Sequence, residues 1–265
     1  GQTATLTAGG ASTYTWTSGP STSSYSVTIA GVYTVTGTDI NSCINTQTVD
    51  LIVNSNPTVT AVSSSSAICS GQTATLTAGG ANTYTWTSGP STSSYSVITA
   101  GVYTVTGTDL NLCINTQTVD LIVNSNPTIT AVSSSSAICS GQTATLTAGG
   151  ASTYTWASGP STSSYSVITA GVYTVTGTDL NLCINTQTVD LIVNSNPTIT
   201  AVSSSSAICS GQTATLTAGG ASTYTWASGP STPIYSVNTA GIYTVTGADL
   251  NLCINTQTVD LIVNS

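Results

Sequence analysis

The stretch that decides the fold is Gly101–Val123, GVYTVTGTDLNLCINTQTVDLIV, which recurs with few changes four times along the chain. In its first arm Tyr103 and Val105 alternate with threonines, and in its second arm Val119 and Leu121 alternate with polar residues. A period of two is typical of a strand with one buried face. Glycine, aspartate and asparagine between the arms favour a turn. The stretch therefore predicts a β-hairpin in each copy, against which the other strands of that copy pack.

The chain is built from tandem copies of one repeat. Three full copies follow one another at Asn56–Ser125, Asn126–Ser195 and Asn196–Ser265, and Gly1–Ser55 matches Gly71–Ser125 without a counterpart of Asn56–Ser70. We therefore expect one domain in each of residues 56–125, 126–195 and 196–265, and a domain that lacks its first strand in residues 1–55. A start inside a repeat favours a longer polypeptide with an unknown number of copies.

Each copy reads as a succession of short strands. In the copy at residues 56–125 we expect strands at Thr58–Val62, Thr73–Ala78, Thr83–Thr87 and near Tyr95–Val97, followed by the two arms of the hairpin. An extra short strand near Ser91–Ser93 is left open, and Ser63–Ser66 and Ser70–Gly71 are expected to form connections on either side of Ile68 and Cys69. Six short strands with a turn roughly every 8–12 residues predict an all-β chain of tandem sandwiches.

The large aromatic residues are expected in the cores of these sandwiches, because a tryptophan on the third strand of a sandwich usually packs inward. The core candidates are one tryptophan and one hairpin tyrosine per copy: Trp16, Trp86, Trp156, Trp226, Tyr33, Tyr103, Tyr173 and Tyr243. Two other interpretations stay open. The aromatic side chains would also suit a platform for stacking sugars, and the Thr-x-Thr ladders invite comparison with ice-binding surfaces.

The composition excludes several classes of function. The chain has no Lys, Arg, His, Met, Phe or Glu, and its charge of −8 comes from eight aspartates. Phosphate binding depends on Lys and Arg, so nucleic acid is excluded as a partner and anionic membranes are disfavoured. No apolar run approaches about 18 residues, so we expect no membrane insertion. Without salt bridges, stability must come from packing, backbone hydrogen bonds and disulfides.

The sequence offers little for catalysis or for cofactors. Without His, Lys or Glu there is no Ser/His/Asp or Cys/His arrangement, so we expect no enzyme activity and no cofactor. The two aspartates of each copy, such as Asp109 and Asp120, are expected to lie far apart. Asp109 and Asn111 form an Asp-x-Asn fragment that leaves a weak calcium alternative, because calcium needs six or more oxygen ligands. Otherwise we expect no metal site.

The seven cysteines are candidates for disulfides that stabilise the repeats. A domain as short as one copy has a small core and needs a further source of stability such as a cross-link. One cysteine of each copy precedes the second strand, and the other opens the last strand. A sandwich can bring such positions together, and a disulfide there would contribute about 4 kcal/mol. We expect disulfides within the repeats, between Cys69 and Cys113, between Cys139 and Cys183, and between Cys209 and Cys253.

Cys43 would then have its partner upstream of Gly1. Two alternatives stay open. In the first, disulfides join neighbouring copies, beginning with Cys43 and Cys69, and Cys253 is left unpaired. In the second, all seven thiols are free. Disulfides within or between copies would both place the chain in an oxidising, extracellular compartment.

A resemblance to a known family rests on four motifs of the repeat, as they stand in the copy at residues 56–125: Cys-Ser-Gly-Gln-Thr-Ala-Thr-Leu-Thr-Ala, Tyr-Thr-Trp, Ala-Gly-Val-Tyr-Thr-Val-Thr-Gly-Thr-Asp, and a cysteine before Val-Asp-Leu-Ile-Val. Together they resemble the tandem immunoglobulin-like domains of bacterial surface proteins, especially those of Bacteroidota, and they are similar to polycystic-kidney-disease-type domains. The resemblance implies a tandem array of small immunoglobulin-like β-sandwich domains, one per copy, that serve as spacers, stalks or adhesive modules on secreted proteins.

Two functions follow from these features of the sequence. The first is structural: near-identical repeats without Lys at their strand edges favour a self-associating extracellular filament or a stiff cell-surface stalk, with the chain itself as the partner. The alternative is an adhesin that binds glycan or another surface. The small differences between copies favour the structural function.

Overall fold

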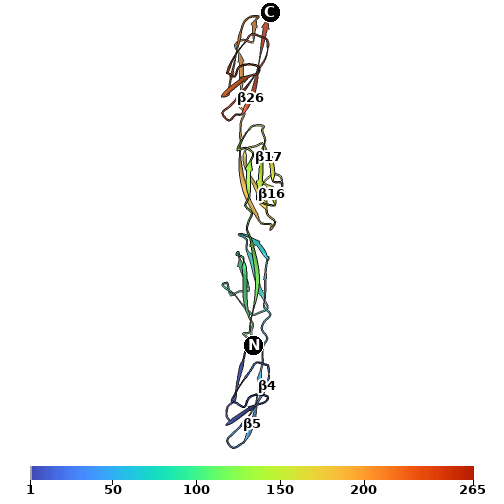
Figure 1. Ribbon diagram of the computed structural model, residues 1–265, viewed down its shortest axis with the longest axis vertical. Helices are drawn as coiled ribbons and strands as arrows, with labels where there is room; N and C mark the ends of the chain where they lie inside the picture. Colours follow the sequence, from blue (N-terminus) through green and yellow to red (C-terminus); the bar gives the residue numbers. More distant parts are fainter. Residues whose placement is uncertain (1) are drawn as a thin grey trace. The chain divides into compact units, whose positions relative to one another are not determined.

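The computed structural model describes residues 2–265, and the regular secondary structure in this range is entirely β (Figure 1). The contacts divide the chain into two compact units, Gly1–Val123 and Asn124–Ser265, and each unit contains two of the predicted repeats. Among the described residues, no helix is long and apolar enough to span a membrane. The all-β fold class is confirmed, whereas the borders of the four predicted domains remain predictions.

The strands repeat along the chain in the same order. The first repeat contains β1 (Ala4–Thr7), β2 (Thr13–Trp16), β3 (Ser24–Val27), β4 (Gly31–Thr38) and β5 (Ile44–Leu51). The second contains β6 (Thr60–Ser63), β7 (Ala67–Cys69), β8 (Ala74–Gly79), β9 (Thr83–Trp86), β10 (Ser94–Val97), β11 (Gly101–Thr108) and β12 (Ile114–Asn124). The third contains β13 (Thr130–Ser133), β14 (Ala137–Cys139), β15 (Ala144–Gly149), β16 (Thr153–Trp156), β17 (Ser164–Val167), β18 (Gly171–Thr178) and β19 (Ile184–Asn194). The fourth contains β20 (Thr200–Ser203), β21 (Ala207–Cys209), β22 (Ala214–Gly219), β23 (Thr223–Trp226), β24 (Ile234–Val237), β25 (Gly241–Ala248) and β26 (Ile254–Asn264).

Each full repeat is an immunoglobulin-like sandwich of two sheets. In the third repeat the strand orders are β13-β15-β17 and β14-β19-β18-β16, and the second and fourth repeats have the same two sheets. The pairings are antiparallel except for β14, which runs parallel to the end of β19. The predicted hairpin is formed by β18 and β19, with Tyr173 opposite Val189 and Thr176 opposite Thr186.

The core between the sheets contains apolar residues that alternate with polar ones along the strands. In the third repeat Leu146 and Val175 are fully buried, and Trp156 is 1% exposed. The indole Nε1–H of Trp156 donates a hydrogen bond to the carbonyl of Thr162 at 3.1 Å, which satisfies its one polar atom. Tyr165 lies between the tryptophan and the hairpin tyrosine, with its ring 6.0 Å from that of Trp156 and 5.9 Å from that of Tyr173.

The sequence interpretation missed one strand of each full repeat. Between the expected connections at Ser63–Ser66 and Ser70–Gly71, where no strand was expected, the structure forms β7 at Ala67–Cys69. No strand forms at Ser91–Ser93, where the described chain bends before β10 begins at Ser94. Three residues that follow a run of serines are too short for a pattern of two to be visible, and pairing with the long last strand is what makes them a strand. This strand changes the cysteine pairing.

Candidate functional site

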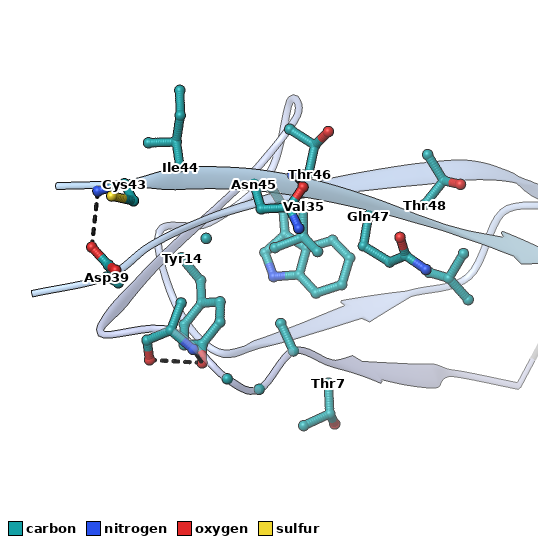
Figure 2. Close-up of a pocket in the computed structure, with 17 residues that line it drawn as sticks. Thr7, Tyr14, Val35, Asp39, Cys43, Ile44, Asn45, Thr46, Gln47 and Thr48 are labelled. Carbon is teal, nitrogen blue, oxygen red and sulfur yellow. Dashed lines mark hydrogen bonds between the residues drawn. The ribbon is translucent and has the colours of Figure 1, made fainter. Parts of the chain in front are cut away.

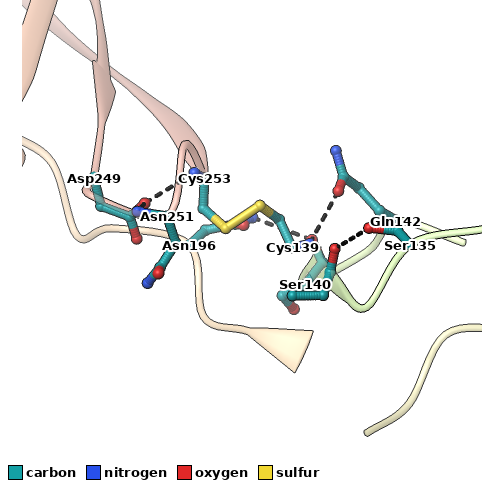
Figure 3. The surroundings of a disulfide bond; sticks show 9 residues. Ser135, Cys139, Ser140, Gln142, Asn196, Asp249, Asn251 and Cys253 are labelled. Carbon is teal, nitrogen blue, oxygen red and sulfur yellow. Dashed lines mark hydrogen bonds between the residues drawn. A yellow bond between two sulfur atoms is a disulfide. The ribbon is translucent and has the colours of Figure 1, made fainter. Parts of the chain in front are cut away.

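The most distinctive site of the described structure is a joint between two successive repeats. Cys139 at the end of β14 in the third repeat forms a disulfide with Cys253 in the hairpin turn of the fourth, with a Cα–Cα distance of 5.4 Å (Figure 3). Across the same joint, Asn196 donates its side-chain amide to the carbonyl of Ser140 at 3.3 Å. The joint is therefore held by a covalent bond and a hydrogen bond besides the connecting chain.

The local folds position both cysteines. On the side of the third repeat, the backbone N–H of Cys139 donates to the side chain of Gln142 at 2.9 Å. On the side of the fourth repeat, the carboxylate of Asp249 accepts the N–H groups of Asn251 at 2.9 Å and of Cys253 at 2.8 Å. Cys253 is fully buried in this turn. The aspartate therefore orders the turn that presents the cysteine.

The predicted pairing within repeats is wrong, and the register of β14 explains why. Cys139 lies opposite Asn194 at the far end of β19, whereas Cys183 immediately precedes the first residue of that strand. The length of this extended strand separates the two positions by about 36 Å, and a disulfide needs Cα atoms within roughly 7 Å of each other. A sandwich with this parallel pairing places its two cysteines at opposite ends.

The remaining cysteines give the same correction. Cys69 and Cys183 are also disulfide-bonded, whereas Cys43, Cys113 and Cys209 are free. The predicted bridges Cys69–Cys113, Cys139–Cys183 and Cys209–Cys253 are therefore all absent from the described structure. The alternative register between neighbouring copies fails as well, because it required Cys113 to bond Cys139 and Cys183 to bond Cys209. The prediction that Cys43 has an upstream partner is not tested.

The aspartates of the hairpin turns have a structural role, because each accepts backbone N–H groups of its own turn. Asp109 Oδ1 accepts the N–H groups of Asn111 at 2.9 Å and Cys113 at 2.8 Å, as its counterparts do in the other copies. Leu112 inside this turn has a φ of 63°, a left-handed conformation that is unfavourable for leucine. The hydrogen bonds to the aspartate hold the turn in this conformation. Among residues 2–265, no three His, Cys, Asp or Glu side chains gather in a way that suits a metal ion.

The aromatic residues are placed as core residues and not as a platform. The exposed fractions of Trp16, Trp86, Trp156 and Trp226 are 3%, 1%, 1% and 1%. The hairpin tyrosines Tyr33, Tyr103, Tyr173 and Tyr243 are half-buried, and each hydroxyl donates to a backbone carbonyl four residues earlier at 2.7–2.8 Å. Their rings pack on a neighbouring tyrosine. This arrangement gives no support to the sugar-stacking alternative.

A second site is an open groove in the first repeat. It has a volume of about 460 Å³ and is lined by Tyr14, Trp16, Val35 and Gly37 on its inner side. Figure 2 shows Tyr14 and Val35 between Thr7 and the strand β5, which carries Asn45, Thr46, Gln47 and Thr48.

The comparisons with known proteins identify no family. No family model and no curated protein matches this chain. Similar solved structures include immunoglobulin domains 1–5 of Sidekick-1, 14% identical over 99% of this chain and 77% of that chain, with a TM-score of 0.27. Titin domains I67–I69 are 13% identical over 80% of this chain and 100% of theirs (TM-score 0.39), and invasin, a bacterial integrin-binding protein, is 15% identical over 95% and 72% (TM-score 0.33). At these values the likeness gives no information on function.

Proposed function

We propose that the chain is a segment of a non-enzymatic extracellular structural array, in which disulfide-joined immunoglobulin-like repeats form a stalk or a filament. The observation that carries this proposal is the Cys139–Cys253 disulfide between successive repeats. A disulfide inside one domain stabilises that domain, whereas a disulfide between domains restrains the joint. Such a restraint suits a protein whose task is to keep its repeats connected outside the cell, where disulfides persist.

The position of the disulfide gives it a mechanical consequence. A pulling force applied at the two ends of the chain passes through the sulfur atoms, so that the 114 residues of sequence separation between Cys139 and Cys253 stay outside the load path. At full extension these residues correspond to about 400 Å of chain length. The array therefore resists extension even when individual sandwiches unfold. The absence of Lys and Arg also removes the cleavage sites of trypsin-like proteases.

Self-association of the array is the second part of the proposal, with other copies of the chain as partners. The last strand of each repeat begins with a run of exposed residues, Ile114–Thr118 in the second repeat and Ile184–Thr188 in the third. Near-identical edges recur at intervals of one repeat and contain no Lys. Edges of this kind favour regular lateral contacts over a single closed complex.

The adhesin alternative has less support. The tryptophans are buried, the hairpin tyrosines are bonded to backbone carbonyls, and the copies differ at few positions. A glycan site would need exposed aromatic faces or a cluster of polar side chains at a concave surface. We therefore propose only the structural function.

Single-molecule pulling of the whole chain tests the mechanical part. We expect the fully stretched length under oxidising conditions to be at least about 400 Å shorter than after complete reduction, because reduction releases the residues between Cys139 and Cys253. Equal lengths before and after reduction would refute a load-bearing joint. Electron micrographs of the oxidised chain at high concentration test self-association. Isolated particles at every concentration would refute the proposal of a filament and would be consistent only with a stalk.

A further inference from the structure

The last strand of each full repeat has an open edge along its first part. β19 has 11 residues, and β14 pairs only with Ile192–Asn194 at its end. The side of Ile184–Asp190 that faces away from β18 has no strand beside it among the described residues. The same edge recurs at Ile114–Asp120 and Ile254–Asp260, because β7 and β21 are also three residues long. Each full repeat therefore offers an extended piece of backbone with which another strand can pair.

The direction of the backbone groups along this edge follows from two hydrogen bonds. The N–H of Ile192 donates to the carbonyl of Ser136 at 3.1 Å, on the side of β14. The side chain of Gln187 accepts the N–H of Thr188, so this N–H does not bond to β18. Backbone groups alternate in direction along a strand. The residues whose N–H and C=O groups point to the open side are therefore Ile184, Thr186, Thr188 and Asp190.

Side-chain amides cover two of these N–H groups, and the two covers differ. Asn185 accepts the N–H of Thr186 at 2.9 Å and donates its own amide to the carbonyl of Pro127 at 3.0 Å, so it is held at both ends. Gln187 accepts the N–H of Thr188 at 3.1 Å and is exposed. A hydrogen bond of an exposed side chain contributes little net stability and is readily exchanged for another. The cover at Thr188 is therefore the one that a partner strand displaces.

The charges at the edge select the strand that fits it. No charged residue lies between Ile184 and Val189, and Asp190 ends this stretch. A carboxylate directly opposite Asp190 in a neighbouring strand would be repelled, and the chain has no basic residue to place there. The same edge of a second copy, run antiparallel, meets this condition because it brings the apolar Ile184 opposite Asp190.

The neighbours of the edge fix the register of such a pair. Beyond Asp190 the place of a partner is taken by β14, and before Ile184 the chain turns back toward β18. The longest antiparallel pairing that avoids both places Ile184 opposite Asp190 and Thr186 opposite Thr188. Its two-fold axis passes between the Gln187 residues of the two copies. The two Asp190 side chains are then roughly 20 Å apart along the strands, so salt screens most of their repulsion.

We propose that the edge Ile184–Asp190, with its counterparts in the second and fourth repeats, is the contact surface of self-association. Each edge adds antiparallel to the same edge of a second copy, about a two-fold axis at Gln187. The four-stranded sheets of the two copies thereby become one continuous sheet. This inference rests on the self-association proposed above and names its contact.

The pairing uses the free backbone groups of both strands. The N–H of Thr188 donates to the carbonyl of Thr186 of the second copy, and the N–H of Asp190 donates to the carbonyl of Ile184 of the second copy. The two-fold axis repeats both bonds. Neither bond disturbs Asn185, which keeps its bonds within its own repeat.

One such contact is weak, and its recurrence along the chain makes it effective. Specific interfaces bury roughly 1,200–2,000 Å² of surface, and a single pair of short strands covers less than this. The edge recurs in the second, third and fourth repeats, so one chain offers several contacts. Linked contacts raise the apparent affinity far above that of one contact. Association therefore depends on how many edges of the chain are intact.

The test traps the pair with a disulfide in the whole chain. Cys43, Cys113 and Cys209 are first changed to serine, because these free thiols would form cross-links of their own. Gln187→Cys then places one thiol at the two-fold axis, where the Cα atoms of opposite residues lie about 4.5 Å apart and suit a disulfide. Thr188→Cys is the matched control on the same edge. In the proposed register its Cα lies more than about 7 Å from that of its counterpart, which is too far for a disulfide.

Under mild oxidation we expect the Gln187→Cys chain to form disulfide-linked dimers about tenfold faster than the Thr188→Cys chain, because pairing holds its two thiols at about millimolar effective concentration. A gel run without reductant measures both rates. A second variant replaces Thr48, Thr118, Thr188 and Thr258 by proline, which removes an outward N–H from each edge and leaves the pairing with the inner strand in place. This chain should sediment as a monomer at concentrations where the original associates.

The outcomes separate this inference from the self-association on which it rests. If the original chain associates but both cysteine chains cross-link equally fast, or the proline chain associates as before, another surface makes the contact and the inference is overturned. Self-association then stands. If the original chain sediments as a monomer at every concentration, self-association and this inference both fail.

Discussion

Gln187 accepts the backbone N–H of Thr188 with its side-chain oxygen at 3.1 Å, and Gln117 makes the same 3.1 Å bond to Thr118. Asn185 does the same for Thr186 at 2.9 Å. These bonds lie on the exposed edge of the last strand, where an unpaired N–H attracts another strand. The chain has no Lys for such edges, and amide side chains cover part of the edge in its place.

Replacement of these glutamines tests whether the edge controls association. We expect a chain with Gln47, Gln117, Gln187 and Gln257 changed to valine to self-associate at a concentration several times lower, because valine leaves the N–H uncovered and favours pairing. Sedimentation velocity over a concentration series measures the effect. The matched Gln→Glu chain keeps the acceptor oxygen and adds charge, so it should stay at least as dispersed as the original. Identical sedimentation of the two variants would contradict this role.

The disulfide pairing is open to a direct chemical test. Cleavage before aspartate places Cys139 in residues 120–178, Cys183 in 179–189, Cys209 in 190–248 and Cys253 in 249–259. We expect the unreduced digest to contain fragment 120–178 linked to fragment 249–259, because Cys139 and Cys253 are bonded. Mass spectrometry before and after reduction identifies the pair. A disulfide between fragments 120–178 and 179–189 would instead show that Cys139 pairs with Cys183, within one repeat.

Much of the sandwich is predictable from alternation alone. Tyr103, Val105 and Leu121 were expected to face inward, and the structure places Val105 and Leu121 in the core with Tyr103 packed against it. The joint is not predictable in this way, because it depends on the very short strand β14, whose partner β19 is the last strand of the repeat. The partner of Cys139 depends on which end of β19 lies beside β14. The local pattern of residues contains no information about that end.

The turn aspartates give a stability prediction. Asp179→Ala removes the acceptor of two N–H groups, from Asn181 and Cys183, so we expect a loss of about 1–3 kcal/mol from the third repeat. Asp179→Asn keeps a side-chain oxygen and should cost clearly less. Calorimetry of the whole chain follows the affected transition, because the repeats need not unfold together. Calcium should leave the unfolding temperature unchanged, and a calcium-dependent rise would revive the metal alternative.

Core packing gives a prediction with a control inside the same repeat. Leu146 is fully buried between the sheets, and we expect Leu146→Ala to destabilise the third repeat by about 2–5 kcal/mol. Leu180 is 89% exposed in the hairpin turn, so Leu180→Ala should change stability by less than about 0.5 kcal/mol. Urea titration followed by tryptophan fluorescence compares the two variants. Equal shifts would mean that the third repeat does not depend on this core.

The charge balance predicts an unusual dependence of solubility on pH. The only charged side chains are eight aspartates, and the sequence isoelectric point is about 4.1. Acidification removes negative charge and therefore repulsion between chains, but no basic side chain supplies positive charge at lower pH. We expect light scattering to rise as the pH falls through about 4 and to stay high at about pH 2, where most proteins dissolve again. Lysine at the exposed positions Thr46, Thr116, Thr186 and Thr256 should restore solubility in this acidic range. Clearing of the original chain there would show that lost charge repulsion is not what drives its association.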